Sequence, residues 1–341
     1  MDVRVATVTL TFADPMRTAF GLLRERELTL LRLRDDDGAV GWGEAAPLEA
    51  YDGVSQAKVR DAFEAYEAIL RDGDGNPAAD LLERCRIVAD VPQALAAVDL
   101  ALWDLAGNRE GKPVSALISD DPDTEVRVNA TIAAEDRAGA AAAAARAVAD
   151  GYRCVKLKVG VGDDAGRIAA VRAAAGPGMA IRIDANGAWS TAHEALANLR
   201  ALAPAGLEYA EEPVHGADAL AAVRAAGVCA VAMDETAEPG AGVTDAVCLK
   251  VGRSGGITGL LRDARLARAA GSDVYVASAF DGPLGIAAGV HAAAALAAGG
   301  PLPWCGLATL TAFDAPPPAL VPAGGAIAVP AGPGLLGAPA P

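Results

Sequence analysis

The sequence predicts an α/β protein in which a (β/α) barrel follows a smaller α+β unit. From residue 126 onward, short apolar strands alternate with helical repeats of apolar residues over at least six consecutive units. Such alternation indicates a parallel sheet, and six or more units favour closure into a barrel. A doubly wound open sheet is the alternative. It usually carries a Gly-rich turn after its first strand, and the residues after 126–132 show none.

The N-terminal unit begins with a meander of three antiparallel strands, as alternating apolar and polar residues indicate. The expected elements are strands at residues 2–11, 27–34 and 39–44, loops at 14–21 and 45–53, and helices at 54–70, 78–89 and 92–107. Pro92 suits the first turn of the third helix and Gly107 its end. We expect residues 1–110 to form an α+β capping domain.

The barrel is expected to occupy residues 111–310. Its predicted strands are residues 126–132, 152–159, 180–184, 207–211, 228–233, 245–250 and 273–277, and its predicted helices are residues 135–150, 163–175, 191–202, 217–226, 257–270 and 283–298. Residues 235–244 hold one Pro and two Gly and are too few for a barrel helix with its loops. We therefore expect one missing helix and a modified TIM barrel of the (β/α)7β type. The Pro- and Gly-rich residues 311–341 are expected to return to the capping domain.

Composition restricts the class of protein. Of the 341 residues, 52% are hydrophobic but only 4% are aromatic, so Ala, Val and Leu must fill a large core. The formal net charge of −15 argues against a nucleic-acid partner and would favour a bound cation. Met1 leads directly into a strand pattern, which predicts no signal peptide, and no segment is typical of a membrane span. The five cysteines form no CxxC pair, which favours a reducing cytoplasm. The oligomeric state is left open.

One predicted barrel strand, residues 155–159, carries two cations. Because side chains alternate along a strand, Lys156 and Lys158 point to one face while the three apolar residues point to the other. Two like charges on one face of a buried strand oppose folding unless opposite charges compensate them. An edge strand with both lysines in water is the simple alternative.

Later strands also end in charged residues, namely Asp184, Glu211, Asp234 and Lys250. Functional residues of such barrels lie at the C-terminal ends of strands, where side chains converge. Three carboxylates would repel one another there without a cation, and they are the hard oxygen ligands that Mg²⁺ prefers, with Mn²⁺ as an alternative. Each acid alone could be an ordinary strand-end charge or a helix cap. That explanation does not account for three acids and three lysines in register on successive strands.

Lys158 and Lys250 would then flank the cation from opposite sides. A free lysine titrates near about 10.4 and cannot accept a proton at neutral pH, but burial, the neighbouring Lys156 and a divalent cation would each lower its pKa. Lys158 would thereby become a competent general base. The positive charges around a bound carboxylate substrate would stabilise the enediolate that forms when the α-proton leaves.

These motifs resemble those of the enolase superfamily, in the subgroup related to muconate lactonising enzyme. The matching stretches are Lys156-Leu157-Lys158, Asp184-Ala185-Asn186, Glu211-Glu212-Pro213, Asp234-Glu235, residues 250–256, Gly41-Trp42-Gly43-Glu44 and residues 101–105. They span nearly the whole chain, and their combination is specific.

The resemblance implies a role for each charged residue of these motifs. The implied Mg²⁺ ligands are Asp184, Glu211 and Asp234. The implied catalytic residues are Lys158 as acid and base, Lys250 on the opposite face of the substrate, and Lys156 beside Lys158. The residues implied to support the ligands from behind are Asn186, Glu212 and Glu235.

Two branches of the superfamily fit less well. The mandelate racemase branch places a His at the end of the seventh strand, where this chain has Tyr275-Val276-Ala277-Ser278. Dipeptide epimerases tend to carry Asp-x-Asp at the eighth strand, and Trp304-Cys305-Gly306-Leu307 has none. The three histidines, His193, His215 and His291, are expected to be structural or solvated.

The remaining resemblance is to the o-succinylbenzoate synthases of menaquinone biosynthesis. It implies a lyase that removes water from 2-succinyl-6-hydroxy-2,4-cyclohexadiene-1-carboxylate by syn elimination through an enediolate. Ser278, Gly282 and Arg253 are the expected substrate-binding residues, and the loops at 14–21 and 45–53 would close over the barrel mouth and select the substrate.

Three other functions stay open at this point. An N-succinylamino acid racemase, or another muconate cycloisomerase-like enzyme, would use the same lysines and metal, and Arg253 keeps that activity open. A Schiff-base lysine aldolase on the same barrel would need no metal. A catalytically inactive binding protein is disfavoured because all six charged positions are intact.

Overall fold

A three-stranded antiparallel sheet forms one side of the N-terminal region. The computed structural model describes residues 1–18, 21–134, 136–160 and 162–337. Within these, β1 (Asp2–Thr18), β2 (Gly21–Arg34) and β3 (Val40–Ala45) lie in the order β1-β2-β3. The predicted meander is therefore confirmed.

The loop expected at residues 14–21 is wrong for the residues described. β1 continues through Thr18 and pairs with β2 after a register shift between Thr11 and Met16, and residues 19–20 lie outside the described residues. Pro15 falls within this irregular stretch, where a proline costs no ladder hydrogen bond. The described residues 14–18 thus belong to a long strand, and the expected closure of this segment over the barrel mouth stays a prediction.

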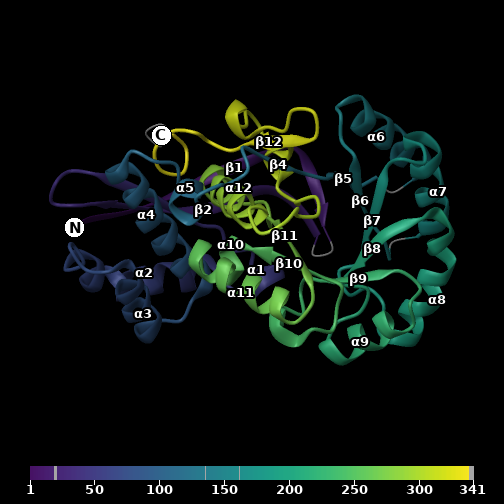
Figure 1. Cartoon of the computed structure of the whole chain (residues 1–341), viewed down its shortest axis with the longest axis horizontal. Coiled ribbons are helices and arrows are strands. Elements are labelled where there is room, and N and C mark those ends of the chain that lie inside the picture. Colours follow the sequence, from purple (N-terminus) through teal and green to yellow (C-terminus); the bar gives the residue numbers. More distant parts are fainter. Residues whose placement is uncertain (19–20, 135, 161, 338–341) are drawn as a thin grey trace.

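The longer helices of this region are α2 (Gln56–Arg71), α3 (Ala78–Val88) and α4 (Pro92–Glu110), followed by the short α5 (Val114–Ile118), and Figure 1 shows α2 to α4 at the end of the molecule opposite α6 to α9. α4 packs directly on β3 because Gly41 and Gly43 have no side chain. A Cβ on Gly41 would lie 2.1 Å from the carbonyl oxygen of Ala101, and a Cβ on Gly43 would lie 1.8 Å from that of Ala97. The Gly-Trp-Gly-Glu motif is thus a contact between a strand and a helix.

The predicted end of α4 at Gly107 is wrong, because the helix continues to Glu110 and ends at Gly111, whose φ of +66° suits glycine. Gly107 lies inside the helix, where a Cβ would come within 2.7 Å of Gly334. Glycine is required there by close packing of the C-terminal tail and not by the helix end.

Seven parallel strands form the second sheet, in the order β11-β10-β9-β8-β7-β6-β5. They are β5 (Ala130–Ile132), β6 (Cys154–Lys158), β7 (Ala180–Asp184), β8 (Leu207–Glu211), β9 (Ala230–Met233), β10 (Ala246–Lys250) and β11 (Asp273–Ala277). The predicted strand at 126–132 is split, since β4 (Glu125–Arg127) pairs instead with β12 (Ala326–Ala328). The parallel order confirms the predicted barrel class.

Residues 304–306 close this sheet into a barrel by bridging its two edges. Asn129 N–H, directly before β5, donates to Cys305 O at 3.0 Å, and Gly306 N–H donates to Val276 O of β11 at 2.8 Å. From inside, the buried Arg182 of β7 donates to Trp304 O at 2.5 Å and lies over the Tyr209 ring at 4.2 Å. The eighth strand position is therefore occupied by a short extended segment.

Helices follow the strands around the outside of the barrel, as Figure 1 shows for α6 to α9. The barrel helices are α6 (Arg137–Ala149), α7 (Asp164–Ala175), α8 (Ala192–Leu202), α9 (Ala217–Ala225), α10 (Val251–Ser254), α11 (Ile257–Ala269) and α12 (Pro283–Ala297). Between β9 and β10 the chain forms only a short 3₁₀ turn, η2 (Pro239–Ala241). The predicted missing helix is confirmed.

The C-terminal tail crosses back to the first region. Its elements are η3 (Ala308–Ala312), η4 (Pro318–Leu320) and β12. Phe313 stacks on Phe12 with ring centroids 4.4 Å apart, and Leu335 N–H donates to Asp104 of α4 at 2.7 Å. The division of the chain at residues 110 and 310 stays a prediction. None of the described helices has the length and apolarity needed to cross a bilayer.

His291 of α12 gives this region a testable pH dependence. Its Nδ1 accepts the Ser115 N–H at 3.1 Å and its Nε2 lies 2.9 Å from Leu335 O, so the buried ring is neutral. Burial lowers the pKa of His291 to about 4. The unfolded chain therefore binds more protons, and stability falls as the pH drops from about 6.5 towards 4.

Replacing His291 with Asn should remove that part of the pH dependence. Urea unfolding at pH 7 and pH 5 should show that the wild type loses about 2 kcal/mol more than H291N over this interval. The exposed His193, changed to Asn in the same way, is the matched control. An equal loss in wild type and H291N would contradict the assignment.

Candidate active site

Three charged residues form a row across adjacent strands. The parallel register pairs Lys158 of β6 with Asp184 of β7, and Asp184 with Glu211 of β8. All three are the last residues of their strands, so their side chains lie at the C-terminal end of the barrel. The next strands continue the row with Asp234, directly after β9, and Lys250, the last residue of β10.

Lys156 and Lys158 both contact Asp184, as expected from their shared face of the strand. Their ammonium nitrogens lie 3.0 and 2.9 Å from Asp184 Oδ2. Lys158 also donates to Asn186 Oδ1 at 2.5 Å, and its side chain stays 39% exposed while Asp184 is buried. Burial opposes the charged form of Asp184, but the two lysines outweigh it and lower its pKa to about 2. Lys158 is therefore the lysine that a ligand can reach.

Glu211 lies at the centre of the row and is completely buried. Its two carboxylate oxygens accept from Lys156 at 2.9 Å and from the Tyr275 hydroxyl at 2.7 Å. Burial nevertheless raises the pKa of Glu211 above its usual value. Burial opposes the charge on Lys156 as well, yet Asp184 and Glu211 together hold its pKa well above the ordinary value. Lys156 is therefore a fixed cation between two carboxylates.

Asp234 is held by two cations and a phenol. Lys250 Nζ contacts both carboxylate oxygens, and Arg253 Nη2 lies 2.8 Å from Oδ1. The Tyr51 hydroxyl lies 3.0 Å from the same oxygen and 2.8 Å from Lys250 Nζ. Burial alone would lower the pKa of Lys250, but Asp234 raises it well above the ordinary value. Lys250 thus carries a positive charge on the side of the row opposite Lys158.

A second set of residues supports the row from behind. Glu212, with an unusual φ of +38°, accepts the N–H groups of Asp234 at 2.8 Å and Thr236 at 3.0 Å. Asn186 N–H donates to Asp184 Oδ1 at 3.0 Å, and its amide donates to Glu235 at 2.8 Å. Asn186, Glu212 and Glu235 thus lie next to the charged row, and their supporting role stays a prediction. Burial, together with Asp234 and Asp184, raises the pKa of Glu235 to about 7.

The expected substrate-binding residues are placed differently. Arg253 touches the metal-ligand candidate Asp234 and the Tyr51 hydroxyl, the latter at 2.7 Å. The Ser278 hydroxyl is 2.5 Å from that of Thr309, and its N–H donates to Gly306 O. The Gly282 N–H donates to Glu44 at 2.7 Å. The backbone N–H groups of Ser278 and Gly282 are therefore already used within the protein.

The donor set fits a hard divalent cation. Glu211, Asp234 and Cys248 place one ligand atom each within 4.8 Å of one another, and Lys156 joins Asp184 to Glu211. Burial raises the pKa of the Cys248 thiol, so the thiolate that soft metals require is disfavoured. Carboxylate oxygens are the ligands that Mg²⁺ prefers. The ammonium groups of the neighbouring lysines already offset part of the negative charge of these carboxylates.

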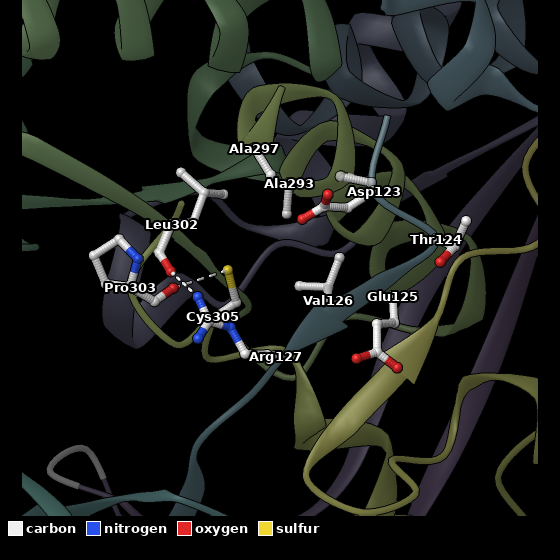
Figure 2. Close-up of a pocket in the computed structure, with 11 residues that line it drawn as sticks. Asp123, Thr124, Glu125, Val126, Arg127, Ala293, Ala297, Leu302, Pro303 and Cys305 are labelled. Carbon is white, nitrogen blue, oxygen red and sulfur yellow. Dashed lines mark hydrogen bonds between the residues drawn. The ribbon is translucent and has the colours of Figure 1, made fainter. Parts of the chain in front are cut away.

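A cavity of about 430 Å³ opens beside this row. Its wall includes Tyr51 from the first region and Asn186, His215, Glu235 and Thr236 from the barrel loops. A second cavity, of about 220 Å³, is drawn in Figure 2 and lies between β4, the end of α12 and residues 302–305. None of the predicted site residues lines that second cavity, so the first is the candidate substrate cavity.

Sequence reasoning missed two tyrosines at the site. Tyr51 lies on α1 (Glu49–Asp52), inside the predicted loop 45–53, and it reaches Lys250 across the boundary between the two regions. Tyr275 is the third residue of β11, and its hydroxyl binds Glu211. Strand alternation from Ala277 back to Tyr275 could have indicated an inward side chain, but nothing local in the sequence marks Tyr51.

Two family models together match most of the chain. Residues 1–119 match the N-terminal domain of the mandelate racemase and muconate lactonizing enzyme family, and residues 139–337 match the enolase C-terminal domain-like family. The match therefore includes the strands that carry the charged row as well as the region that supplies Tyr51.

Characterised relatives agree with this match but differ among themselves. The o-succinylbenzoate synthase of Thermobifida fusca is 35% identical over 89% of this chain and 81% of its own. The N-succinyl-L-Arg/Lys racemase of Bacillus cereus is 27% identical over 85% of this chain and 83% of its own. The dipeptide epimerase structure from Cytophaga hutchinsonii, a complex with Mg and D-Ala-L-Val, has a TM-score of 0.85 and 26% identity, covering 98% of this chain and 94% of that one. The chain belongs to the enolase superfamily, in the group related to muconate lactonizing enzyme.

Proposed function

We propose that this enzyme is an o-succinylbenzoate synthase. The observation that carries the proposal is the placement of two lysines, Lys158 and Lys250, on opposite sides of one row of carboxylates. The 35% identity with the Thermobifida fusca synthase supports the choice of reaction. Absence of an Asp-x-Asp motif in residues 304–307 argues against a dipeptide epimerase.

In the proposed reaction, Lys158 takes the proton on the carbon next to the substrate carboxylate. The electron pair moves onto the carboxylate as an enediolate, whose charge the Lys250 ammonium stabilises. The bond to the hydroxyl group on the same face then breaks, and the proton held by Lys158 leaves with that hydroxyl as water. The resulting ring is aromatic, which makes the elimination strongly favourable.

The metal would be held by Asp184, Glu211 and Asp234. When bound, Mg²⁺ or Mn²⁺ would supply further positive charge at the substrate carboxylate. Asn186 and Glu212 hold two of these acids through the hydrogen bonds described above, and their role is to fix the orientation of the carboxylates. We place the reaction in the cytoplasm, in keeping with five free cysteines, and expect a small carboxylate as the substrate.

An N-succinylamino acid racemase is the second candidate. The contact of Arg253 with both Asp234 and Tyr51 adds a cation beside Lys250, and the Bacillus cereus relative is a racemase of this kind. In that reaction one lysine would remove the α-proton and the other would return a proton on the opposite face. The same two side chains therefore serve both proposals.

A paired assay of the purified protein with Mg²⁺ separates the two. The cyclohexadiene substrate should lose water and give 2-succinylbenzoate, followed by absorbance and by mass spectrometry of the product. N-succinylamino acids should racemise far more slowly than the cyclohexadiene loses water. Racemisation is followed by the loss of optical rotation and by exchange of the α-proton in D₂O. Racemisation without any loss of water from the cyclohexadiene would reject the synthase and support the racemase.

A further inference from the structure

Arg26 of β2 connects two loops at the barrel mouth through their backbones. The buried guanidinium donates to Ala46 O at 3.0 Å and Pro47 O at 2.7 Å, where the loop carrying Tyr51 begins. It also donates to Ala279 O at 3.4 Å and Phe280 O at 3.3 Å, in the loop between β11 and α12. The rigid fork of an arginine can reach several carbonyls at once, which an ammonium group cannot do with the same geometry.

Glu44 of β3 holds the other end of the same loop. Its carboxylate is buried and accepts the Gly282 N–H at 2.7 Å and the Leu284 N–H at 3.2 Å, at the N-terminus of the long helix α12. These N–H groups have no partner within the helix, and the helix dipole favours an acid there. A Cβ on Gly282 would lie 2.6 Å from the same carboxylate, so the fit is close.

The loop between these two contacts is strained. Phe280 has a φ of +61°, a conformation that costs a bulky residue energy unless its surroundings impose it. Its carbonyl is bound by Arg26, and its ring packs edge-on against Phe12 at 5.3 Å. Asp281 follows it and is buried as well. Contacts from the first region thus impose a loop shape that the chain would not adopt alone.

This loop borders the candidate active site. Ala277 of β11 lies directly beside Lys250 of β10 in the sheet. The loop begins at the next residue, Ser278. The other loop held by Arg26 carries Tyr51, whose hydroxyl lies 2.8 Å from Lys250 Nζ. One buried side chain therefore fixes two segments that reach the same side of the charged row.

We propose that Arg26 and Glu44 are positioning residues that set the shape of two loops beside the charged row: residues 45–53, whose Tyr51 lines the candidate substrate cavity, and residues 278–282, which begin beside Lys250. They act through these loops and do not touch the reacting atoms. The identity of the substrate in this inference rests on the proposed function. The role of the two residues in holding the loops does not depend on it. Loss of either residue should weaken substrate binding and leave the chemistry at Lys158 largely intact.

Arg26→Lys keeps the charge but removes the fork, and Glu44→Gln keeps the size but places a donor against a backbone donor. Arg24→Lys is the matched control, because Arg24 lies two residues earlier on the same strand with its side chain exposed. Each variant would be assayed for kcat and KM with the cyclohexadiene substrate and for binding of 2-succinylbenzoate by calorimetry with Mg²⁺ present. Hydrogen exchange of residues 45–53 and 278–285 would be followed by mass spectrometry, with the peptide containing β7 as a folding control.

We expect R26K and E44Q to raise KM about tenfold or more with kcat within about threefold of wild type. Exchange should accelerate at least about tenfold in both loops for R26K, and in residues 278–285 for E44Q, with β7 unchanged. Wild-type exchange and KM in both variants would overturn the proposal, as would a fall in kcat alone. A wild type that neither converts the cyclohexadiene nor binds 2-succinylbenzoate would reject the proposed function, while the exchange data would still decide the role of Arg26 and Glu44.

Discussion

Replacing Lys158 with alanine should abolish turnover while the protein stays folded. Lys158 is the partly exposed lysine of the row, and its ammonium group contacts Asp184 and Asn186. Removing it deletes the proposed base and the proton donor for the leaving hydroxyl in one step. We expect the rate to fall to below about a hundredth of wild type, since general acid–base catalysis commonly contributes a factor of about 10² to 10⁴.

The measurement is kcat with the cyclohexadiene substrate, together with circular dichroism and thermal unfolding to show that the fold is kept. Lys112→Ala is the control, because Lys112 is an exposed lysine in an ion pair with Glu110, outside the site. The control should retain wild-type activity. Residual activity of K158A above about a hundredth of wild type would remove Lys158 from the proposed role.

Sequence reasoning placed the charged row correctly because short strands with strong alternation leave little freedom. Lys156 and Lys158 had to share a face, and the length of each βα unit placed Asp184 and Glu211 at the same end of the sheet. The structure puts both lysines on one oxygen of Asp184. The missing helix followed in the same way, since residues 235–244 cannot supply a helix with its loops.

The errors arise where distant segments decide the local structure. Gly107 looked like a helix end, but its lack of a side chain serves the tail at Gly334, which lies far away in the sequence. Residues 14–21 looked like a loop because the alternating pattern breaks there, but pairing with β2 extends the strand through Thr18. Local propensity is a weak guide when long-range pairing supplies the hydrogen bonds.

The contact of Glu44 with α12 could not be foreseen for a related reason. Glu44 stood out only as part of a motif, and its partners Gly282 and Leu284 lie about two-thirds of the chain away. Gly282 was expected to bind substrate directly. In the structure its N–H instead binds Glu44 and fixes the loop. The residue that shapes this loop therefore belongs to the capping region and not to the barrel.

The metal requirement can be tested most directly at Asp184. Its carboxylate accepts from Lys156 and Lys158 and is completely buried, so Asp184→Asn removes one negative charge with almost no change in shape. We expect the Mg²⁺ concentration for half-maximal activity to rise at least about tenfold, because a neutral amide is a weaker ligand for a hard cation. Two lysines would also lose their counter-charge, which opposes a further cation at the same place.

Binding should be measured apart from turnover, by titrating Mn²⁺ and following its paramagnetic resonance signal in the wild type and in D184N. Asp218→Asn is the matched control, because it makes the same chemical change on an exposed residue of α9 and should leave the titration unchanged. An unchanged titration in D184N would rule out Asp184 as a ligand. Full wild-type activity in excess EDTA would reject the metal-dependent reaction itself, and trapping of a substrate aldehyde on Lys158 with borohydride would then favour a Schiff-base mechanism.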